Sequence, residues 1–431
     1  MLTSLALALL LGAAPVVDDQ LPDDSTLQIL HHSGPGASDG GGGGVLGRQS
    51  NGGVLGIDTL TNFGSYFYFP GLVPTSYGDA PQYTWPYTMV GNAPFGHDDA
   101  SEGTTKIPAP IVPVIVDLRN YDGSPRYFIL PDGTQGPRMI LDPTQYVTPV
   151  LNSPIFQKAS YGSSERPTQF NDAVHRAQFY RSSEDGWHTL LVPAVKTTRT
   201  MVLIRGTYRF RADATGHLRY VLVDDRAFGS ALFPPTAADT TTVIGAAENA
   251  GDVTPRDLST FLFANVFLYQ GGNPANCCVL GYHSYDMEPG DAANGWREKH
   301  YVMNYSSWIS PGIFGGGFQD ITALSHELAE IFSDPFGNNA TPIWVAPNGL
   351  CQNNLENGDV IEGLLNAVFP MTMNGYTYHP QNEALLQWFA GQSPSSAYQH
   401  AYSYPDTTVL TSPAVSYTSD CTTPANFVNK R

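Results

Sequence analysis

The sequence predicts an α+β fold, in which helices and strands follow one another without regular βαβ alternation. Residues 110–118 (PIVPVIVDL) are apolar and β-branched, which is typical of a buried strand. Residues 321–331 place apolar side chains at helical spacing. Because 42% of the 431 residues are hydrophobic, the chain can bury a sizeable core.

Composition divides the chain into four parts. Residues 1–17 have the features of a signal peptide, and residues 18–55 form a Gly-rich flexible leader that contains the run DGGGGG. Residues 56–107 are rich in Tyr, Phe, Pro and Gly, which indicates short strands or loops. Residues 108–431 form the predicted main domain.

The N-terminus carries an apolar run, residues 5–11, followed by Gly12-Ala13-Ala14. The run is too short to span a bilayer and matches the apolar core and small-residue cleavage site of a secretory signal. It predicts a secreted, extracellular protein; the alternative is an apolar N-terminal strand. No later stretch is long and apolar enough to predict a membrane span.

The formal net charge is −18 at pH 7, and no basic cluster offsets it. Such a chain repels a polyanionic backbone, so nucleic acid is not an expected partner. Only 14% of the residues are charged, so the surface depends on uncharged polar side chains, a composition common in exported proteins.

The main domain contains further predicted elements. Helices are expected at residues 142–157, 169–180 and 256–269, each opened by a capping residue or a proline. Strands are expected at residues 110–118, 188–195, 278–284 and 299–305, together with a hairpin of residues 201–211 and 218–224.

Four cysteines are present, and an even number in an exported chain predicts up to two disulfides. Adjacent cysteines rarely bond to each other. We therefore expect Cys277 and Cys278 to pair with Cys351 and Cys421, in either order. A thiolate metal site is the alternative, although the chain has no C-x-x-C spacing.

The segment Ser325-His326-Glu327-Leu328-Ala329-Glu330 lies in the helix predicted from residue 321 onward. Asp320 stands at the expected N-cap, and Ser333-Asp334-Pro335 is a stop signal. His326 and Glu330 are four residues apart, so both project from one face, on a flank of the apolar stripe.

This spacing suits a metal ion. A histidine and a carboxylate one turn apart can hold one ion, and catalytic zinc needs three protein ligands and an open position for water. Glu327, beside His326, can take a proton from a water bound to the same ion. His326 and Glu330 are therefore predicted metal ligands, Zn²⁺ is the predicted cofactor, and Glu327 is the predicted catalytic base.

His326-Glu327-x-x-Glu330 resembles the H-E-x-x-H motif of zincin metallopeptidases, with Glu330 in place of the second histidine. The longer pattern SHELAExxSDP, followed by Glu356-x-Gly358-Asp359, is similar to a group of exported bacterial and fungal proteins. The resemblance implies a zincin-like main domain that has a mixed sheet and an active-site helix.

The third ligand is expected after the helix, as in zincins. Glu356 and Asp359 are the equal first candidates, because the turn Glu356-Asn357-Gly358-Asp359 would present carboxylates to the helix. Weaker candidates are Glu362, His379, His283 and His300.

The predicted function is metal-assisted hydrolysis of a peptide bond in a peptide or protein substrate. The alternative is a non-catalytic protein associated with cell-wall polysaccharide, which keeps a structural ion and stacks sugars on some of its 23 Tyr and 6 Trp residues. A third reading is an inhibited precursor whose residues 18–105 cover the cleft.

Overall fold

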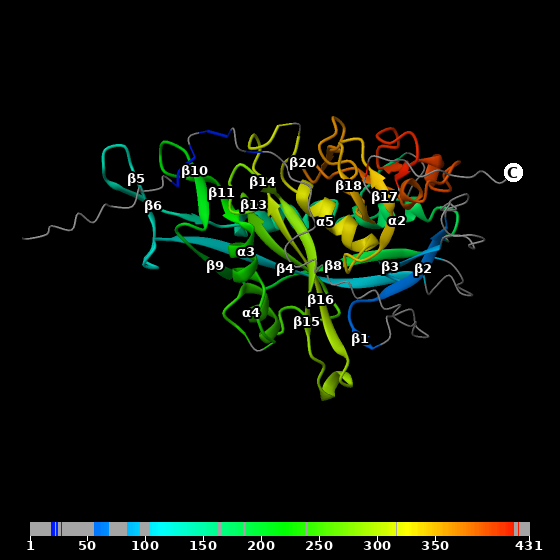
Figure 1. Cartoon of the computed structure of the whole chain (residues 1–431), viewed down its shortest axis with the longest axis horizontal. Coiled ribbons are helices and arrows are strands. Elements are labelled where there is room, and N and C mark those ends of the chain that lie inside the picture. The colour runs from blue at the N-terminus through cyan, green and yellow to red at the C-terminus, as the bar shows by residue number, and fades with distance from the viewer. Residues whose placement is uncertain are drawn as a thin grey trace, which may run out of the picture.

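The structure is a computed structural model, and the residues that it describes are 19–21, 23, 24, 27, 56–68, 84–94, 103–162, 166–183, 186–237, 239–315, 317–417 and 421. The predicted signal peptide and most of the Gly-rich leader lie outside them. Within the described residues, six α-helices surround a mostly parallel central sheet (Figure 1). None of these helices is long and apolar enough to cross a membrane.

The central sheet has eight strands: β1 (Ile57–Asp58), β4 (Thr104–Arg119), β7 (Ile140–Leu141), β8 (His188–Val195), β9 (Arg199–Ile204), β12 (Leu258–Ala264), β15 (Gly281–Glu288) and β16 (Glu298–Trp308). All pairings are parallel except those of β7 with β4 and β15 with β16. β15 is therefore an antiparallel outer strand, next to β16.

Side chains alternate between the two faces of this sheet, as strand geometry requires. On β12, Leu258 and Leu262 pack with Leu324 and Leu328, whereas Phe261 packs into the opposite core. Helices α2 (Phe170–Gln178) and α5 (Thr322–Ser333) cover the first face, and α3 (Asp225–Leu232) and α4 (Val243–Asn249) cover the other (Figure 1).

Smaller sheets and two short helices complete the described structure. They are β10 (Tyr208–Ala212), β11 (Leu218–Asp224), β13 (Val266–Tyr269) and β14 (Cys277–Val279) in one sheet; β17 (Ala340–Val345), β18 (Cys351–Asn354) and β23 (Ser416–Tyr417) in another; the pairs β2 (Asn62–Tyr68) with β3 (Thr84–Val90), β5 (Tyr127–Ile129) with β6 (Gln135–Arg138), β19 (Met371–Met373) with β20 (Tyr376–Tyr378), and β21 (Glu383–Ala384) with β22 (Ser403–Tyr404); and α1 (Val147–Leu151) and α6 (Leu386–Phe389).

Most predicted strands of the main domain are confirmed. The prediction for residues 188–195 coincides with β8, and residues 110–118 and 299–305 lie within β4 and β16. β2 and β3 form an antiparallel hairpin in the aromatic segment. The predicted domain boundary after residue 107 falls inside β4, so the aromatic segment and the main domain share a strand.

The helix predicted over residues 256–269 is wrong. That stretch forms β12 and β13, which end up in different sheets. Every residue of both strands is buried. A strand that is buried on both faces is continuously apolar, so its pattern cannot be distinguished from that of a buried helix.

Two other predictions need correction. Only residues 144–151 of the predicted helix 142–157 are helical, and the chain turns before Pro154, which lacks a backbone donor. The hairpin is formed by β10 and β11 alone, because β9 pairs with β4. The break between β9 and β10 contains Gly206 at φ +98°, a conformation that glycine adopts readily.

The predicted disulfide pairing is also wrong. Cys277 bonds to Cys278, and Cys351 bonds to Cys421, 70 residues away. The prediction rested on the rarity of disulfides between adjacent cysteines, whose bond geometry is strained. The peptide bond between Cys277 and Cys278 is cis.

Part of the predicted leader is docked on the main domain. Leu21 N donates to Phe210 O at 2.8 Å, and Phe210 N donates to Asp19 O at 2.9 Å. The buried Asp19 carboxylate accepts from Arg126 Nη1 at 2.9 Å and from Arg205 Nε at 2.5 Å. These contacts hold residues 19–21 against β10.

Replacing Asp19 with Ala should lower the free energy of unfolding by about 3 kcal/mol, because a buried pair loses one partner. Chemical denaturation measures the change. Asp24→Ala is the matched control: its side chain is 35% exposed, so its ion pair with Arg219 should contribute less than about 1 kcal/mol. Equal losses for both variants would contradict this account.

His175 on α2 is a buried histidine among the rings of Phe63, Phe179, Trp187 and Phe332. Burial lowers its pKa from 6.5 to about 4. The neutral form is therefore favoured in the folded state, and the unfolded state binds an extra proton between these two values.

The stability contributed by neutral His175 should be fully present above pH 6.5 and should be lost as the pH falls towards 4, by up to about 3 kcal/mol. His175→Phe should remove this part of the pH dependence. Urea denaturation at several pH values measures it, with His217→Gln on the exposed surface as control. An unchanged profile in His175→Phe would refute the assignment.

Candidate metal centre

Helix α5 places the predicted motif inside the protein. All of its residues are buried, with Leu324, Leu328 and Ile331 packed toward the sheet. The helix ends at Ser333, as predicted. Its start differs from the prediction, because Ile321 occupies the N-cap position. Asp320 instead accepts from Ile321 N at 2.6 Å and from His379 N at 2.9 Å, so it joins the helix start to a distant loop.

The loop after β18 folds back over α5 and is held there by Glu330. Glu330 Oε1 accepts hydrogen bonds from Gly358 N at 3.1 Å and Asp359 N at 3.2 Å. Gln381 Nε2 donates to Gly358 O at 2.8 Å, and Gln381 N donates to Ser325 Oγ at 2.8 Å. The predicted turn therefore reaches the predicted helix.

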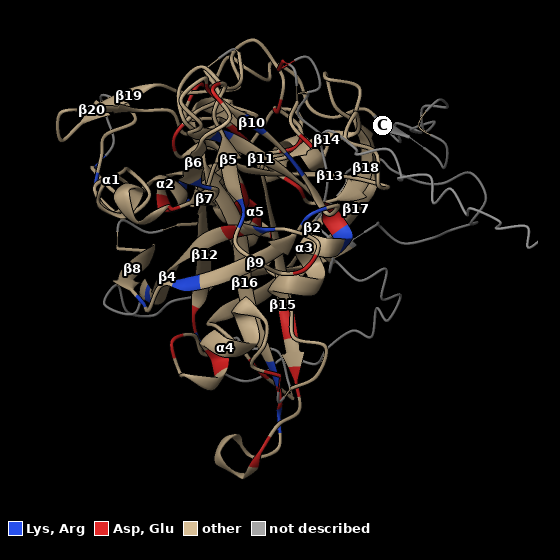
Figure 2. Ribbon diagram, turned by 90° about the vertical axis from the view of Figure 1, so that its left-hand side faces the viewer, with Lys and Arg blue, Asp and Glu red and all other residues tan. Residues whose placement is uncertain are grey.

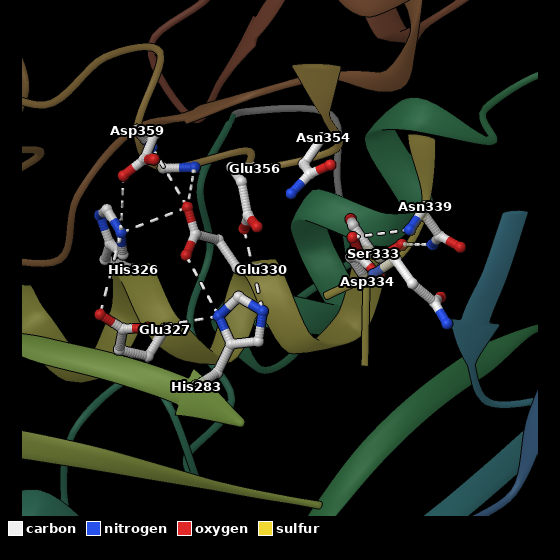
Figure 3. Close-up of polar contacts among 12 residues, drawn as sticks. His283, His326, Glu327, Glu330, Ser333, Asp334, Asn339, Asn354, Glu356 and Asp359 are labelled. Carbon is white, nitrogen blue, oxygen red and sulfur yellow. Dashed lines mark hydrogen bonds and ion pairs between the residues drawn. The ribbon is translucent and has the colours of Figure 1, made fainter. Parts of the chain in front are cut away.

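Three of the predicted ligands converge. His326 Nε2 lies 3.2 Å from Glu330 Oε1 and 3.6 Å from Asp359 Oδ1. The ligand atoms of these three buried residues all lie within 4.8 Å of one another, so they could hold a metal ion. Glu327 Oε1 lies 3.9 Å from His326 Nε2, beside this group (Figure 3).

Glu356 was an equal candidate with Asp359, but the structure places it elsewhere. Its Oε2 lies 3.8 Å from Nε2 of His283, a residue of β15 that was a weaker candidate. His283 Nδ1 lies 3.4 Å from Glu330 Oε2 and 3.5 Å from Glu327 Oε2. His283, Glu327 and Glu330 form a second group that could hold an ion.

These spacings differ from those of three partly buried histidine–carboxylate pairs elsewhere in the protein. The partly buried pairs His188–Asp172, His300–Glu298 and His379–Asp320 have nitrogen–oxygen distances of 2.6–2.7 Å, as hydrogen bonds do. The pairs around α5 are separated by 3.2–3.9 Å. Ligands about 2.0–2.1 Å from a tetrahedral ion lie about 3.3 Å apart, which is close to the spacing within both groups.

Two of the weaker candidates are occupied elsewhere. His379 contacts Asp320 through Nδ1 and Gln319 through Nε2, and His300 contacts Glu298. Glu362 lines the cavity beside His326. Glu383 on β21 is not recognisable from the sequence as part of this site. It is fully buried, its pKa is raised by burial, and it interacts electrostatically with His326 and Glu330. Its only sequence signal is the polar run Gln381-Asn382-Glu383.

The charges of the two groups are strongly coupled. Burial alone would lower the pKa of His283 and His326, but the surrounding glutamates raise both pKa values well above 6.5. Burial would raise the pKa of Glu330, but the two imidazoles lower it below its usual value. Burial raises the pKa of Glu327 and of Glu356. The protonated form of both imidazoles is therefore favoured beside these carboxylates.

A small cavity opens between these side chains. Its volume is about 20 Å³, measured as the space open to the centre of a water molecule, which is enough for about one water. The cavity is lined by Leu280, Gly281, Phe318, Thr322, Ala323, His326, Glu327, Asp359, Glu362 and Gln381.

A third carboxylate group lies on α4 and on the far end of β15 from His283, and the ribbon of both elements carries the red of Asp and Glu in Figure 2. It consists of Glu248, Asp286 and Glu288. Burial and its acidic neighbours raise the pKa of Glu248 to about 9. The protonated form of Glu248 is therefore favoured at neutral pH, which lowers the negative charge of this group.

Comparison with known protein families, with curated proteins and with solved structures gives no match to this chain.

Gly358 is needed for the approach of the loop to His326. A Cβ atom at this position would lie 2.5 Å from His326 Nδ1, closer than real Cβ contacts allow. If this candidate centre binds Zn²⁺, Gly358→Ala should displace the imidazole and weaken that binding by at least about tenfold, or 1.4 kcal/mol. Isothermal titration calorimetry measures it. Gly315→Ala, where a Cβ meets nothing within 4 Å, is the control and should bind normally. Unchanged affinity in Gly358→Ala would mean that the imidazole is not a ligand.

Proposed function

We propose that this protein is a secreted, zinc-dependent hydrolase that cleaves peptide bonds. The observation that carries the proposal is the convergence of His326, Glu330 and Asp359 at co-ligand spacing, with Glu327 beside them at a cavity large enough for a water. A mixed nitrogen and carboxylate set of three protein ligands fits catalytic zinc. Two disulfides fit an oxidising compartment.

The chemistry assigned to the chain is general acid–base catalysis. Bound zinc would lower the pKa of a water and polarise a carbonyl group. Glu327, buried next to His326, would accept the proton of that water and pass it to the leaving nitrogen. Asp359 and Glu330 would hold the ion, while Gly358 N and Asp359 N fix the orientation of the Glu330 carboxylate.

The surroundings of Glu327 also favour a peptide substrate. The antiparallel outer strand β15 begins at Gly281, where a Cβ would lie 2.8 Å from Glu327 Cγ. Among the described strands, β15 pairs only with β16, so an extended peptide could add to its other edge once the buried residues 281–284 beside Glu327 become accessible. A zincin-like arrangement of helix and outer strand is part of the proposal.

Glu327→Gln should keep the ion held by His326, Glu330 and Asp359 and lose hydrolysis by at least about 100-fold, because the amide cannot accept the proton. Asp359→Asn should lose both metal and activity. Metal content is measured by mass spectrometry, and activity by digestion of a mixed peptide library. Hydrolysis by Glu327→Gln at the wild-type rate would refute the catalytic role, and wild-type protein without zinc would refute the cofactor.

One observation favours the alternative of a non-catalytic, cell-wall-associated protein with a structural ion. His326 and Glu327 are only 7% and 4% exposed, and the cavity beside them is small. A larger groove of about 310 Å³ lies between the β2–β3 hairpin and α2, lined partly by Tyr66, Tyr87 and Gln178. Such a mixture of aromatic and amide side chains suits a sugar.

The two functions differ in what metal removal does. For a structural ion, chelation should lower the unfolding temperature, and no peptide should be cleaved before or after chelation. For the hydrolase, re-addition of zinc should restore cleavage. Binding of a wall polysaccharide that Tyr66→Ala abolishes would support the alternative.

A further inference from the structure

We propose that the centre holds a second cation, bound by His283, Glu327 and Glu330, so that the Glu330 carboxylate is shared by two ions. This inference adds a second ion to the single-ion site of the proposed function. It rests on the proposed function only because both ions would share Glu330.

Glu330 is placed to serve two ions because its two oxygens face different histidines. Oε1 lies 3.2 Å from His326 Nε2, and Oε2 lies 3.4 Å from His283 Nδ1 (Figure 3). Each oxygen belongs to a separate group of three residues whose ligand atoms lie within 4.8 Å of one another. A bridging carboxylate places two metal ions about 3.5–4 Å apart in known two-metal sites.

The second group has the spacing of ligands. His283 Nδ1 lies 3.4 Å from Glu330 Oε2 and 3.5 Å from Glu327 Oε2, near the separation of about 3.3 Å expected around a tetrahedral ion. Both contacts are longer than the 2.6–2.7 Å of the hydrogen-bonded histidine–carboxylate pairs elsewhere in the chain. A cation between these atoms accounts for their separation.

Glu356 supplies an independent observation. It is 1% exposed, and within the described residues neither of its carboxylate oxygens has a hydrogen-bond partner. Its Oε2 faces Nε2 of His283 at 3.8 Å, on the opposite side of the ring from Glu330 (Figure 3). Histidines that bind a metal through one nitrogen commonly present the other to a carboxylate. Glu356 is thus a positioning residue for His283.

The buried charge also favours more than one cation. Carboxylates gather around the two imidazoles, each at most 6% exposed: Glu327, Glu330, Asp334, Glu356, Asp359, Glu362 and Glu383. The ion-pair partners of Glu327, Glu330 and Glu356 are His283 and His326. Buried charges are costly unless they are paired or bind metals, so a second cation beside His283 would stabilise the ionised form of the carboxylates that face it.

A second ion has a consequence for Glu327. Its Oε2 belongs to the second group, whereas its Oε1 faces His326. An ion on Oε2 would withdraw electrons from the carboxylate and make it a weaker base. If Glu327 is the base of a hydrolase, activity should rise with the first equivalent of zinc and fall with the second.

The test is the number of ions bound by the full chain. Protein stripped by a chelator is titrated with Zn²⁺ by calorimetry, and its metal content after gel filtration is measured by mass spectrometry. Wild type should bind two ions, and His283→Ala and His326→Ala should each bind one. Glu356→Gln should weaken one of the two ions about 10–100-fold and leave the other unchanged. His217→Ala, on the exposed surface, should bind two.

One ion in saturated wild type, or two in His283→Ala, would overturn the inference. If His283→Ala does not fold, Glu356→Gln decides, and two ions of unchanged affinity would overturn it. The result is separable from the hydrolase proposal. One ion with hydrolysis that depends on Glu327 overturns only the second site, whereas two ions without hydrolysis support the second site and overturn the hydrolase.

Discussion

The buried Glu330 carboxylate is the interaction on which the centre depends. One side chain accepts from two backbone amides of the loop at Gly358 and Asp359, and it faces both His326 and His283. It therefore joins α5, the returning loop and β15 at a single point. A carboxylate is suited to this task, because each of its oxygens can accept more than one contact. A histidine at this position could not contact both imidazoles and two amides.

Much of the centre could be predicted, because it depends on local spacing. Four residues along a helix return to the same face, so His326 and Glu330 were identified from the sequence. The turn Glu356-Asn357-Gly358-Asp359 was found from its composition, and the structure brings Asp359 to His326. The contact of Glu356 with His283 could not be predicted in the same way. The sequence of a four-residue turn does not show toward which histidine each of its carboxylates points.

The positions of His283 and Glu383 near α5 could not be predicted from local spacing in the sequence. His283 reaches α5 because β15 pairs antiparallel with β16, and no local pattern encodes that neighbour. Strands buried on both faces cause a related failure. β12 and β13 were predicted to be one helix, since a continuous apolar run has no period that reports its secondary structure. Strands bounded by polar or turn residues, such as β8, were predicted correctly.

Strand β4 links the two halves of the protein in one further respect. Its 16 residues span about 50 Å, and its first half packs in the core around α2 and α5 while its second half packs in the core of α3 and α4. One continuous strand thus contributes side chains to both cores. If either core unfolds, part of β4 is exposed to solvent. The two halves should therefore melt together as one cooperative unit, and a substitution in the core of α3 and α4 should change the rigidity of the candidate metal centre.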